Sequence, residues 1–219
     1  MKDLKKLSRR LSWLLRHGAN EVGLSMDAAG WVAVSDVMRH LRVSDEALEA
    51  CVATNNKQRF QVDGTQIRAC QGHSTEGTPV TADALEASWH RVVRTDPLFH
   101  GTTPEAVTDI ANSGGLRPMA RTHVHLAGTP HDKVGKRANV GVLLVVDPQA
   151  LTAAGQSVFQ SPNGVFLVRT VPWECVTDVR TLSRRAQAQR AWLRGHLTVA
   201  GGPGSLRRSD ACGPESPRW

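Results

Sequence analysis

The sequence of 219 residues contains no tyrosine and only four phenylalanines. Proteins that bind single-stranded nucleic acids without sequence preference stack bases on several aromatic side chains, so this shortage argues against such a platform. No stretch approaches the roughly 20 apolar residues that a membrane span needs. The N-terminal segment MKDLKKLSRRLSWLL has no long apolar run and no signal cleavage site. We therefore expect no contact with membranes and a cytoplasmic location.

Cysteine is also scarce, and no pair has the C-x-x-C spacing. The absence of that spacing excludes zinc sites of the cysteine type, and a disulfide framework is unexpected in a chain of this size. His123 and His125 alternate on one expected strand and His100 precedes a Gly-Thr turn, but no acidic or cysteine partner lies at a matching spacing. We expect no metal site. The four cysteines are Cys51, Cys70, Cys175 and Cys212.

Positive charge is what the chain has in excess. Lys and Arg number 27 against 20 for Asp and Glu, which gives a net charge of +7 and a pI near 9.8. Such a balance favours a polyanionic partner. Much of the excess lies near the N-terminus, where Lys5, Lys6, Arg9 and Arg10 surround a leucine stripe at helical spacing. Gly18 can end this predicted helix.

The next segment predicts short helices followed by a hairpin. Ser35 and Ser44 are placed to cap two helices, and RFQV and TQIRA read as strands joined at Asp63-Gly64. Helices followed by a hairpin describe a winged-helix-like lobe, for which we take residues 1–75. The second capped segment, SDEALEACVAT, is acidic and would be repelled by DNA, so reading of the major groove fits poorly.

The rest of the chain changes character. Residues 76–94 are polar and read as a connector, whereas short apolar runs separated by Gly, Pro and Asn predict a mostly β lobe over residues 95–198. One helix is expected over residues 104–114 and another over 183–197. The Gly-, Pro- and Ser-rich tail, residues 199–219, is predicted to be disordered. The predicted fold class is therefore α+β.

Several familiar catalytic patterns are missing. No G-x-G-x-x-G follows a strand, and neither a Ser-His-Asp signature nor a pair of carboxylates stands out. Arginines and histidines remain at the ends of predicted elements, namely Arg16-His17, Arg59 and Arg121. Planar guanidinium groups bind phosphate in a bidentate manner, so this set predicts a phosphate site.

Seven segments resemble the tRNA 2′-phosphotransferase family, NAD-dependent enzymes that remove an internal 2′-phosphate from RNA. They occur in order between about residue 4 and residue 170, and they read LSRRLSWLLRHG, GWVAVSDVM, NNKQRFQV, IRACQGHS, LFHGT, GGLRPMARTHVHLA and SPNGVFLV. The resemblance implies a winged-helix-like lobe joined to an ADP-ribosyltransferase-like β lobe, with the active site between them. It also implies NAD as co-substrate, an RNA carrying a 2′-phosphate as partner, and we expect a monomer.

Carried over onto this sequence, the family's functional residues form two sets. The catalytic set would be Arg16, His17, Arg59 and Arg121, with Arg121 preferred to Arg117 because it stands just before THVHL. Ala127 departs from the pattern, since many relatives carry Ser there, which would remove a hydroxyl contact to the cofactor. The residues implied in the NAD pocket are His100, Gly101, Thr102, His125, Asn163 and Gly164.

The reaction that the resemblance implies has two steps. The RNA 2′-phosphate first displaces nicotinamide from NAD, and the resulting ADP-ribosylated RNA then releases 2′-hydroxyl RNA and ADP-ribose 1″,2″-cyclic phosphate. One alternative is an ADP-ribosyltransferase that acts on terminal phosphates of RNA or DNA. Another is a winged-helix regulator that binds nucleic acid without catalysis.

Overall fold

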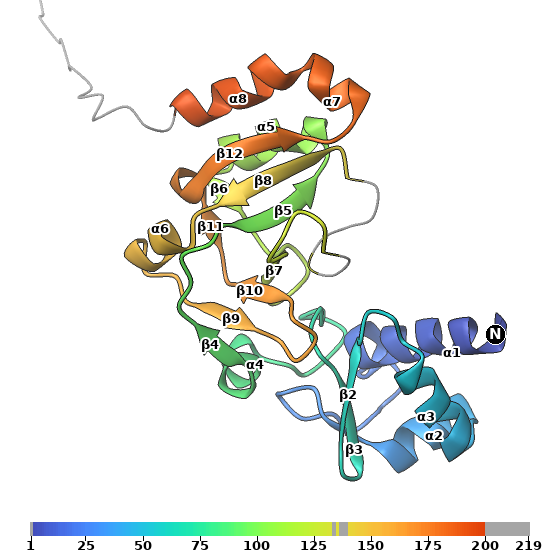
Figure 1. The fold of residues 1–219 in the computed structure, drawn as a ribbon. Helices are drawn as coiled ribbons and strands as arrows, with labels where there is room; N and C mark the ends of the chain where they lie inside the picture. The colour runs from blue at the N-terminus through green and yellow to red at the C-terminus, as the bar shows by residue number, and fades with distance from the viewer. Residues whose placement is uncertain (1, 133–134, 136–139, 200–219) are drawn as a thin grey trace, which may run out of the picture.

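The computed structural model describes residues 2–132, 135 and 140–199. It shows a mixed α+β protein with several small antiparallel sheets (Figure 1), which confirms the predicted α+β class. Two large hydrophobic cores lie at different places along the chain, one built from residues 4–69 and one from residues 92–197. We call residues 2–70 the N-terminal region and residues 82–199 the C-terminal region.

The N-terminal region packs helices against a three-stranded sheet of order β1-β3-β2. The leucine stripe of the first helix is buried in its core, together with Ile67 of the hairpin, as the helical spacing predicts. Its elements are α1 (Lys2–Trp13), the π-helix η1 (Leu14–Gly18), β1 (Val32–Ala33), α2 (Val34–Leu41), α3 (Asp45–Ala53), β2 (Phe60–Asp63) and β3 (Gln66–Ala69).

The first helix does not stay α-helical to its end. Its last five residues form η1, in which each hydrogen bond spans five residues instead of four. A Cβ atom at Gly18 would lie 2.4 Å from the Trp13 ring, so only glycine allows the ring to cover the backbone there. Gly18 thus lies inside η1 and packs against Trp13, and the prediction that Gly18 caps this helix is wrong, because the residue after η1 is Ala19, which is itself in the helical conformation.

Of the other predicted turn and cap signals, two are confirmed and one is wrong. Ser44 caps α3 by accepting a hydrogen bond from the Ala47 N–H at 3.4 Å. Strands β2 and β3 form the predicted hairpin, whose turn residues are Gly64 and Thr65. Ser35 does not cap α2, because that helix already begins at Val34 and makes no side-chain cap.

The C-terminal region consists of a four-stranded sheet of order β4-β9-β10-β7, a three-stranded sheet of order β12-β8-β5 and the pair β11-β6. Strand β8 is buried at every residue, as expected for a central strand. The elements are α4 (Ala82–Ser88), β4 (His90–Val92), β5 (Leu98–Thr102), α5 (Pro104–Asn112), β6 (Gly115–Leu116), β7 (Val124–Leu126), β8 (Val142–Val146), α6 (Pro148–Ala153), β9 (Val158–Gln160), β10 (Phe166–Val168), β11 (Val171–Pro172), η2 (Trp173–Cys175), β12 (Val176–Thr181), α7 (Arg184–Ala188) and α8 (Arg190–Val199).

The helices expected over residues 104–114 and 183–197 are present, the second as two short helices, α7 and α8. The segment read as a connector carries α4 and β4, and β4 joins the sheet beside β9. The tail that was predicted to be disordered lies outside the described residues from 200 onward. The boundaries of the two expected lobes stay predictions.

Hydrogen bonds link the two regions near residues of the predicted site, in part through residues 71–81 between them. Residues 73–75 run beside the Arg121 segment, with a β-bridge between Ser74 and Arg121 and a hydrogen bond from Thr75 N to the Ala120 carbonyl (3.3 Å). On the C-terminal side, the Trp89 indole N–H donates to the Cys70 carbonyl at 3.1 Å. These contacts fix how residues from distant parts of the sequence meet.

The cysteines and the helices bear on the expectations about disulfides and membrane spans. Cys51, Cys70 and Cys175 are buried free thiols, and Cys212 lies outside the described residues. Among residues 2–132, 135 and 140–199, no helix is long and apolar enough to cross a bilayer.

Candidate active site

Arg16 lies at the centre of the predicted site. Its Nε and Nη2 atoms are buried and have no hydrogen-bond partner within the described residues. Burial, and next the positive charges of Arg59 and Arg121, lower the pKa of Arg16 to about 10. The guanidinium therefore stays charged at neutral pH while it lacks an anionic partner. A buried, unpaired charge is costly, and a bound anion would remove that cost.

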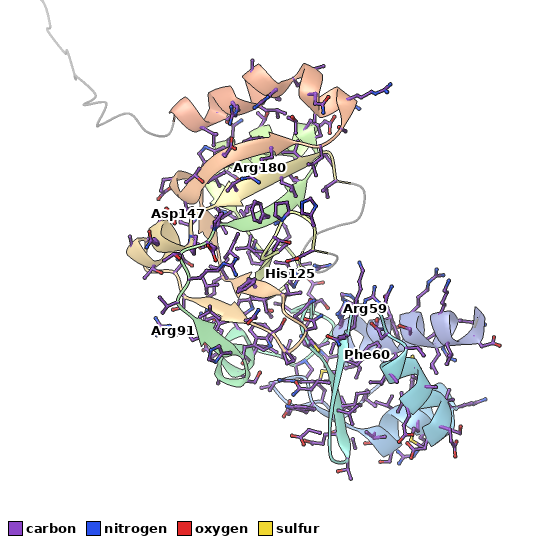
Figure 2. The ribbon with its side chains drawn as sticks, in the orientation of Figure 1. Arg59, Phe60, Arg91, His125, Asp147 and Arg180 are labelled. Carbon is purple, nitrogen blue, oxygen red and sulfur yellow. The ribbon has the colours of Figure 1, made fainter. Side chains whose placement is uncertain are left out.

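Arg59 enters the same site from the loop before β2. The Asn55 side-chain oxygen accepts hydrogen bonds from the Arg59 backbone N–H at 3.2 Å and from its Nη1 at 3.5 Å. In Figure 2, Arg59 lies at the edge of the N-terminal region that faces the C-terminal region, and His125 lies across from it in the C-terminal region. The Arg59 residue is half-buried.

Arg121 approaches from the C-terminal region. Its Nη1 donates to His125 Nδ1 at 2.9 Å. Ser74 links this segment to Arg16, because its backbone bridges Arg121 while its own N–H donates to the Arg16 carbonyl at 2.8 Å. The structure therefore brings together three arginines that the sequence separates by as many as 105 positions.

His17 completes the predicted catalytic set. Its imidazole is exposed beside Arg16, and partial burial together with the charges of Arg16 and Arg121 lowers its pKa below the ordinary histidine value. The free protein thus holds His17 mainly in the neutral form at pH 7. An anion bound by the arginines would offset their charge and raise the pKa again.

Next to His17 lies a cavity of about 510 Å³. The segment 74–77 forms much of its wall, and a Cβ atom at Gly77 would lie 1.8 Å from the His17 carbonyl oxygen, so glycine is required for this close approach. Two carboxylates on the rim contrast with the arginines nearby. The lining residues are His17, Asn20, Glu21, Ser74, Glu76, Gly77 and Ala120.

The two histidines of the expected NAD pocket lie on the neighbouring strands β5 and β7. His100 Nδ1 is 3.1 Å from the His125 carbonyl oxygen, which can only accept, so the proton of His100 is on Nδ1. Since Arg121 can only donate, His125 Nδ1 must be an acceptor, and the His125 proton is on Nε2. Burial, followed by the charges of Arg121 and Arg16, lowers the pKa of His125 well below the ordinary value and keeps this tautomer neutral.

The remaining predicted NAD residues lie on β5 and on the turn between β9 and β10. Gly101 and Thr102 are buried parts of β5. Gly164 has a φ of +79° and open space where a Cβ would be. Asn163 differs from these, because its buried amide already bonds to Ser161 and to the Lys57 carbonyl.

Ala127, the departure from the family pattern, is almost completely buried at 1% exposure. It packs with Phe99, Leu143 and Val145 in a small apolar cluster, and its backbone pairs with Phe99 through two hydrogen bonds of 2.8 and 3.0 Å. The side chain at this position therefore contributes to packing between β5 and the segment after β7.

Sequence reasoning missed several residues that support the site. Asn55, which holds Arg59, has no local signal beyond a polar Asn-Asn pair. His73 is fully buried near Arg16, and its position in the IRACQGHS segment gives no indication of this burial. Glu86 accepts from His123 at 2.9 Å and from Arg169 at 2.7 Å, which ties α4 to the strand that carries His125. No spacing rule relates these residues.

Among residues 2–132, 135 and 140–199, no group of three or more His, Cys, Asp and Glu side chains is arranged to hold a metal ion.

Comparison with known proteins gives a consistent result. The model of the RNA 2′-phosphotransferase, Tpt1/KptA family matches residues 2–170. A probable RNA 2′-phosphotransferase of Pseudomonas syringae is 38% identical over 188 residues, which cover 81% of this chain and 96% of the relative. Proteins with the same description from Burkholderia lata and Nostoc punctiforme are each 37% identical and are covered to 92% and 97% of their lengths.

Proposed function

The chain belongs to the RNA 2′-phosphotransferase family, an enzyme family, and from this premise we propose that it transfers an internal 2′-phosphate of RNA to NAD. The products would be nicotinamide, RNA with a 2′-hydroxyl, and ADP-ribose 1″,2″-cyclic phosphate. An RNA of the tRNA splice-junction type is the proposed substrate. The family membership confirms the resemblance seen in the sequence and leaves the non-catalytic regulator without support.

One observation carries the proposal: two buried guanidinium nitrogens of Arg16 have no hydrogen-bond partner among the residues that the structure describes, and Arg59 and Arg121 lie close enough to lower its pKa. Three converging arginines match a phosphate monoester, whose three terminal oxygens accept bidentate hydrogen bonds. The 2′-phosphate of an RNA is the ligand that the family description supplies for such a site.

The first step needs positioning more than acid–base catalysis. A phosphate monoester is already anionic, so the arginines have only to hold one of its oxygens against the reacting ribose carbon. NAD, when bound, supplies that carbon and a leaving group that departs neutral. His100 and His125 fit a site for it, because their tautomers are fixed, His100 bonds to the His125 carbonyl, and the His125 ring bonds to Arg121. Gly101, Thr102 and Gly164 are proposed to line the same site.

In the second step the ribose 2″-hydroxyl would bond to phosphorus, giving up its proton and closing the cyclic phosphate, while the bond from phosphorus to the RNA 2′-oxygen breaks. The arginines are proposed to stabilise the charge on the equatorial oxygens of the phosphorus. His17 is proposed to donate a proton to the departing 2′-oxygen. Its lowered pKa in the free protein means that it takes up this proton only after phosphate has offset the charges of Arg16 and Arg121. A purely phosphate-binding role for His17 is the alternative.

The proposed function also assigns roles to the two regions. Helices followed by the β2–β3 hairpin support a winged-helix-like lobe, proposed over residues 1–75, and the small sheets after it support an ADP-ribosyltransferase-like lobe over residues 95–198. Residues from both sides contribute to the arginine cluster. The proposed site therefore lies where the two lobes meet.

A single incubation tests the proposal. The protein is mixed with NAD and a short RNA that bears one internal 2′-phosphate, and all products are resolved by mass. We expect nicotinamide, 2′-hydroxyl RNA and the cyclic phosphate together, and we expect Arg16→Ala to form none of them. Transfer of ADP-ribose to a terminal phosphate, with the internal 2′-phosphate untouched, would favour the terminal-phosphate alternative. Product formation without NAD would contradict the proposal.

A further inference from the structure

The segment Lys57–Arg59 has a strained backbone. Gln58 has a φ of +45°, in the left-handed region that residues other than glycine rarely adopt. Such a conformation persists only where surrounding contacts hold it in place. Since Arg59 follows Gln58 directly, the contacts that hold this segment also set the position of the Arg59 guanidinium.

Each of the six backbone polar groups of the segment has a hydrogen bond. Five of the bonds come from the N-terminal region. The Asn55 side-chain oxygen accepts from the N–H groups of Lys57 (3.3 Å) and Arg59 (3.2 Å), and the Asn55 carbonyl accepts from Gln58 N–H (2.8 Å). Cys70 donates its thiol to the Gln58 carbonyl at 3.3 Å and its N–H to the Arg59 carbonyl at 2.8 Å.

The sixth bond comes from the C-terminal region. Asn163, in the turn between β9 and β10, donates its Nδ2 to the Lys57 carbonyl at 3.1 Å across 106 positions of sequence. Its amide is only 8% exposed, and its oxygen accepts from the Ser161 hydroxyl at 2.8 Å. That second bond fixes the orientation of the amide, so that the N–H group points toward Lys57.

We propose that Asn163 is a positioning residue that holds Arg59 in place for the 2′-phosphate. The proposal rests on the phosphate-binding role proposed above for Arg59. In this proposal the main role of the Asn163 side chain is to hold Arg59, and not to contact NAD directly. The two roles differ in the substrate they affect: a residue that holds Arg59 controls recognition of the phosphate, whereas a cofactor contact controls affinity for NAD.

The test compares Asn163→Ala and Asn163→Asp with the wild-type protein. Asp keeps the size of the side chain and its bond from Ser161 but cannot donate to Lys57. Asn112→Ala, at an exposed asparagine that ends α5, is the matched control. Dissociation constants are measured for one RNA with and without the 2′-phosphate, together with KM for NAD and the thermal midpoint.

For both Asn163 variants we expect the preference for phosphorylated over unphosphorylated RNA to fall about tenfold, the size of one lost hydrogen bond to a partly buried group. KM for NAD should stay within about twofold of wild type, and Asn112→Ala should behave as wild type. In an Arg59→Ala background, Asn163→Ala should cause no further loss, because two residues that act through one contact are not additive.

Three results would overturn the inference. They are a raised KM for NAD with unchanged phosphate preference, equal loss of affinity for both RNAs, and a full additional loss in the Arg59→Ala background. Failure of the underlying premise looks different, since Arg59→Ala by itself would then leave the phosphate preference intact. If a variant has a lowered thermal midpoint, the comparison is made at a temperature where both proteins are folded.

Discussion

The buried His73 makes the stability of this protein sensitive to acid. Its side chain has 0% exposure, and neither ring nitrogen has a hydrogen-bond partner among the described residues. Burial lowers the pKa of His73 to about 3, and the charges of Arg16, Arg68 and His17 add to this effect. The folded protein therefore holds this histidine neutral at any pH at which it is used.

The direction of the effect follows from proton binding. The unfolded chain protonates His73 near pH 6.5, but the folded chain does so only near pH 3. Stability from the neutral ring is thus fully present above pH 6.5 and is lost as the pH falls toward 3. Between pH 7.5 and pH 4.5 the loss is about 3 kcal/mol, since nearly all of it accumulates over the two pH units below 6.5 at about 1.36 kcal/mol each.

Urea unfolding at pH 7.5 and pH 4.5 measures this loss. His73→Leu replaces the ring with an apolar side chain of similar size, so it should remove the acid-sensitive contribution while keeping the core filled. We expect the wild-type protein to lose about 3 kcal/mol more than the variant between the two pH values. His90→Gln, at an exposed histidine, is the control and should keep the wild-type loss. Equal losses in wild type and His73→Leu would refute the reasoning.

Three further predictions concern other parts of the molecule. Arg9→Ala with Arg10→Ala removes two exposed charges of α1, so KM for RNA should rise and depend less on salt while kcat changes little; an unchanged KM at low salt would contradict a role in tracking the RNA backbone. Arg68→Ala removes a guanidinium that is 2% exposed and bonded to three oxygen atoms, so urea unfolding should show a loss of about 3 kcal/mol; a loss below about 1 kcal/mol would show that these bonds add little. His17→Ala should let ADP-ribosylated RNA accumulate, as seen by mass, because only the second step needs its proton; normal turnover would leave His17 without a catalytic role.

Local features of the fold could be predicted from short stretches of sequence. The spacing of the leucines between residues 4 and 15 placed the first helix, and Ser44 was correctly read as the cap of α3. Asp63-Gly64 indicated the hairpin, although the turn itself is Gly64-Thr65. Each of these signals depends on residues that are neighbours in the chain. Ser35 failed as a cap because Val34 continues directly from β1 into α2, a choice set by packing.

The site could be predicted only in part. Arg16, Arg59 and Arg121 were selected as phosphate ligands from their residue type and from a family resemblance, and the structure brings them together. No sequence pattern indicated the roles of Asn55 and His73. An asparagine that holds a loop cannot be told from other asparagines by sequence alone, nor can a histidine that fills a core be told from other histidines. Asn163 was expected at NAD, but its amide bonds to Lys57.

The sequence by itself determined the helical and strand periodicities, the excess of positive charge and the family to which the chain belongs. Tertiary structure decided that three arginines from different elements meet and that two buried nitrogens of Arg16 find no partner in the described part of the chain. It also decided that the strained backbone at Gln58 is held by contacts from both regions. The physical reason is distance along the chain. Periodicity and capping arise from neighbouring residues, whereas the Ser74–Arg16 and Asn163–Lys57 bonds join residues 58 and 106 positions apart. No short stretch of sequence contains both partners of such a bond.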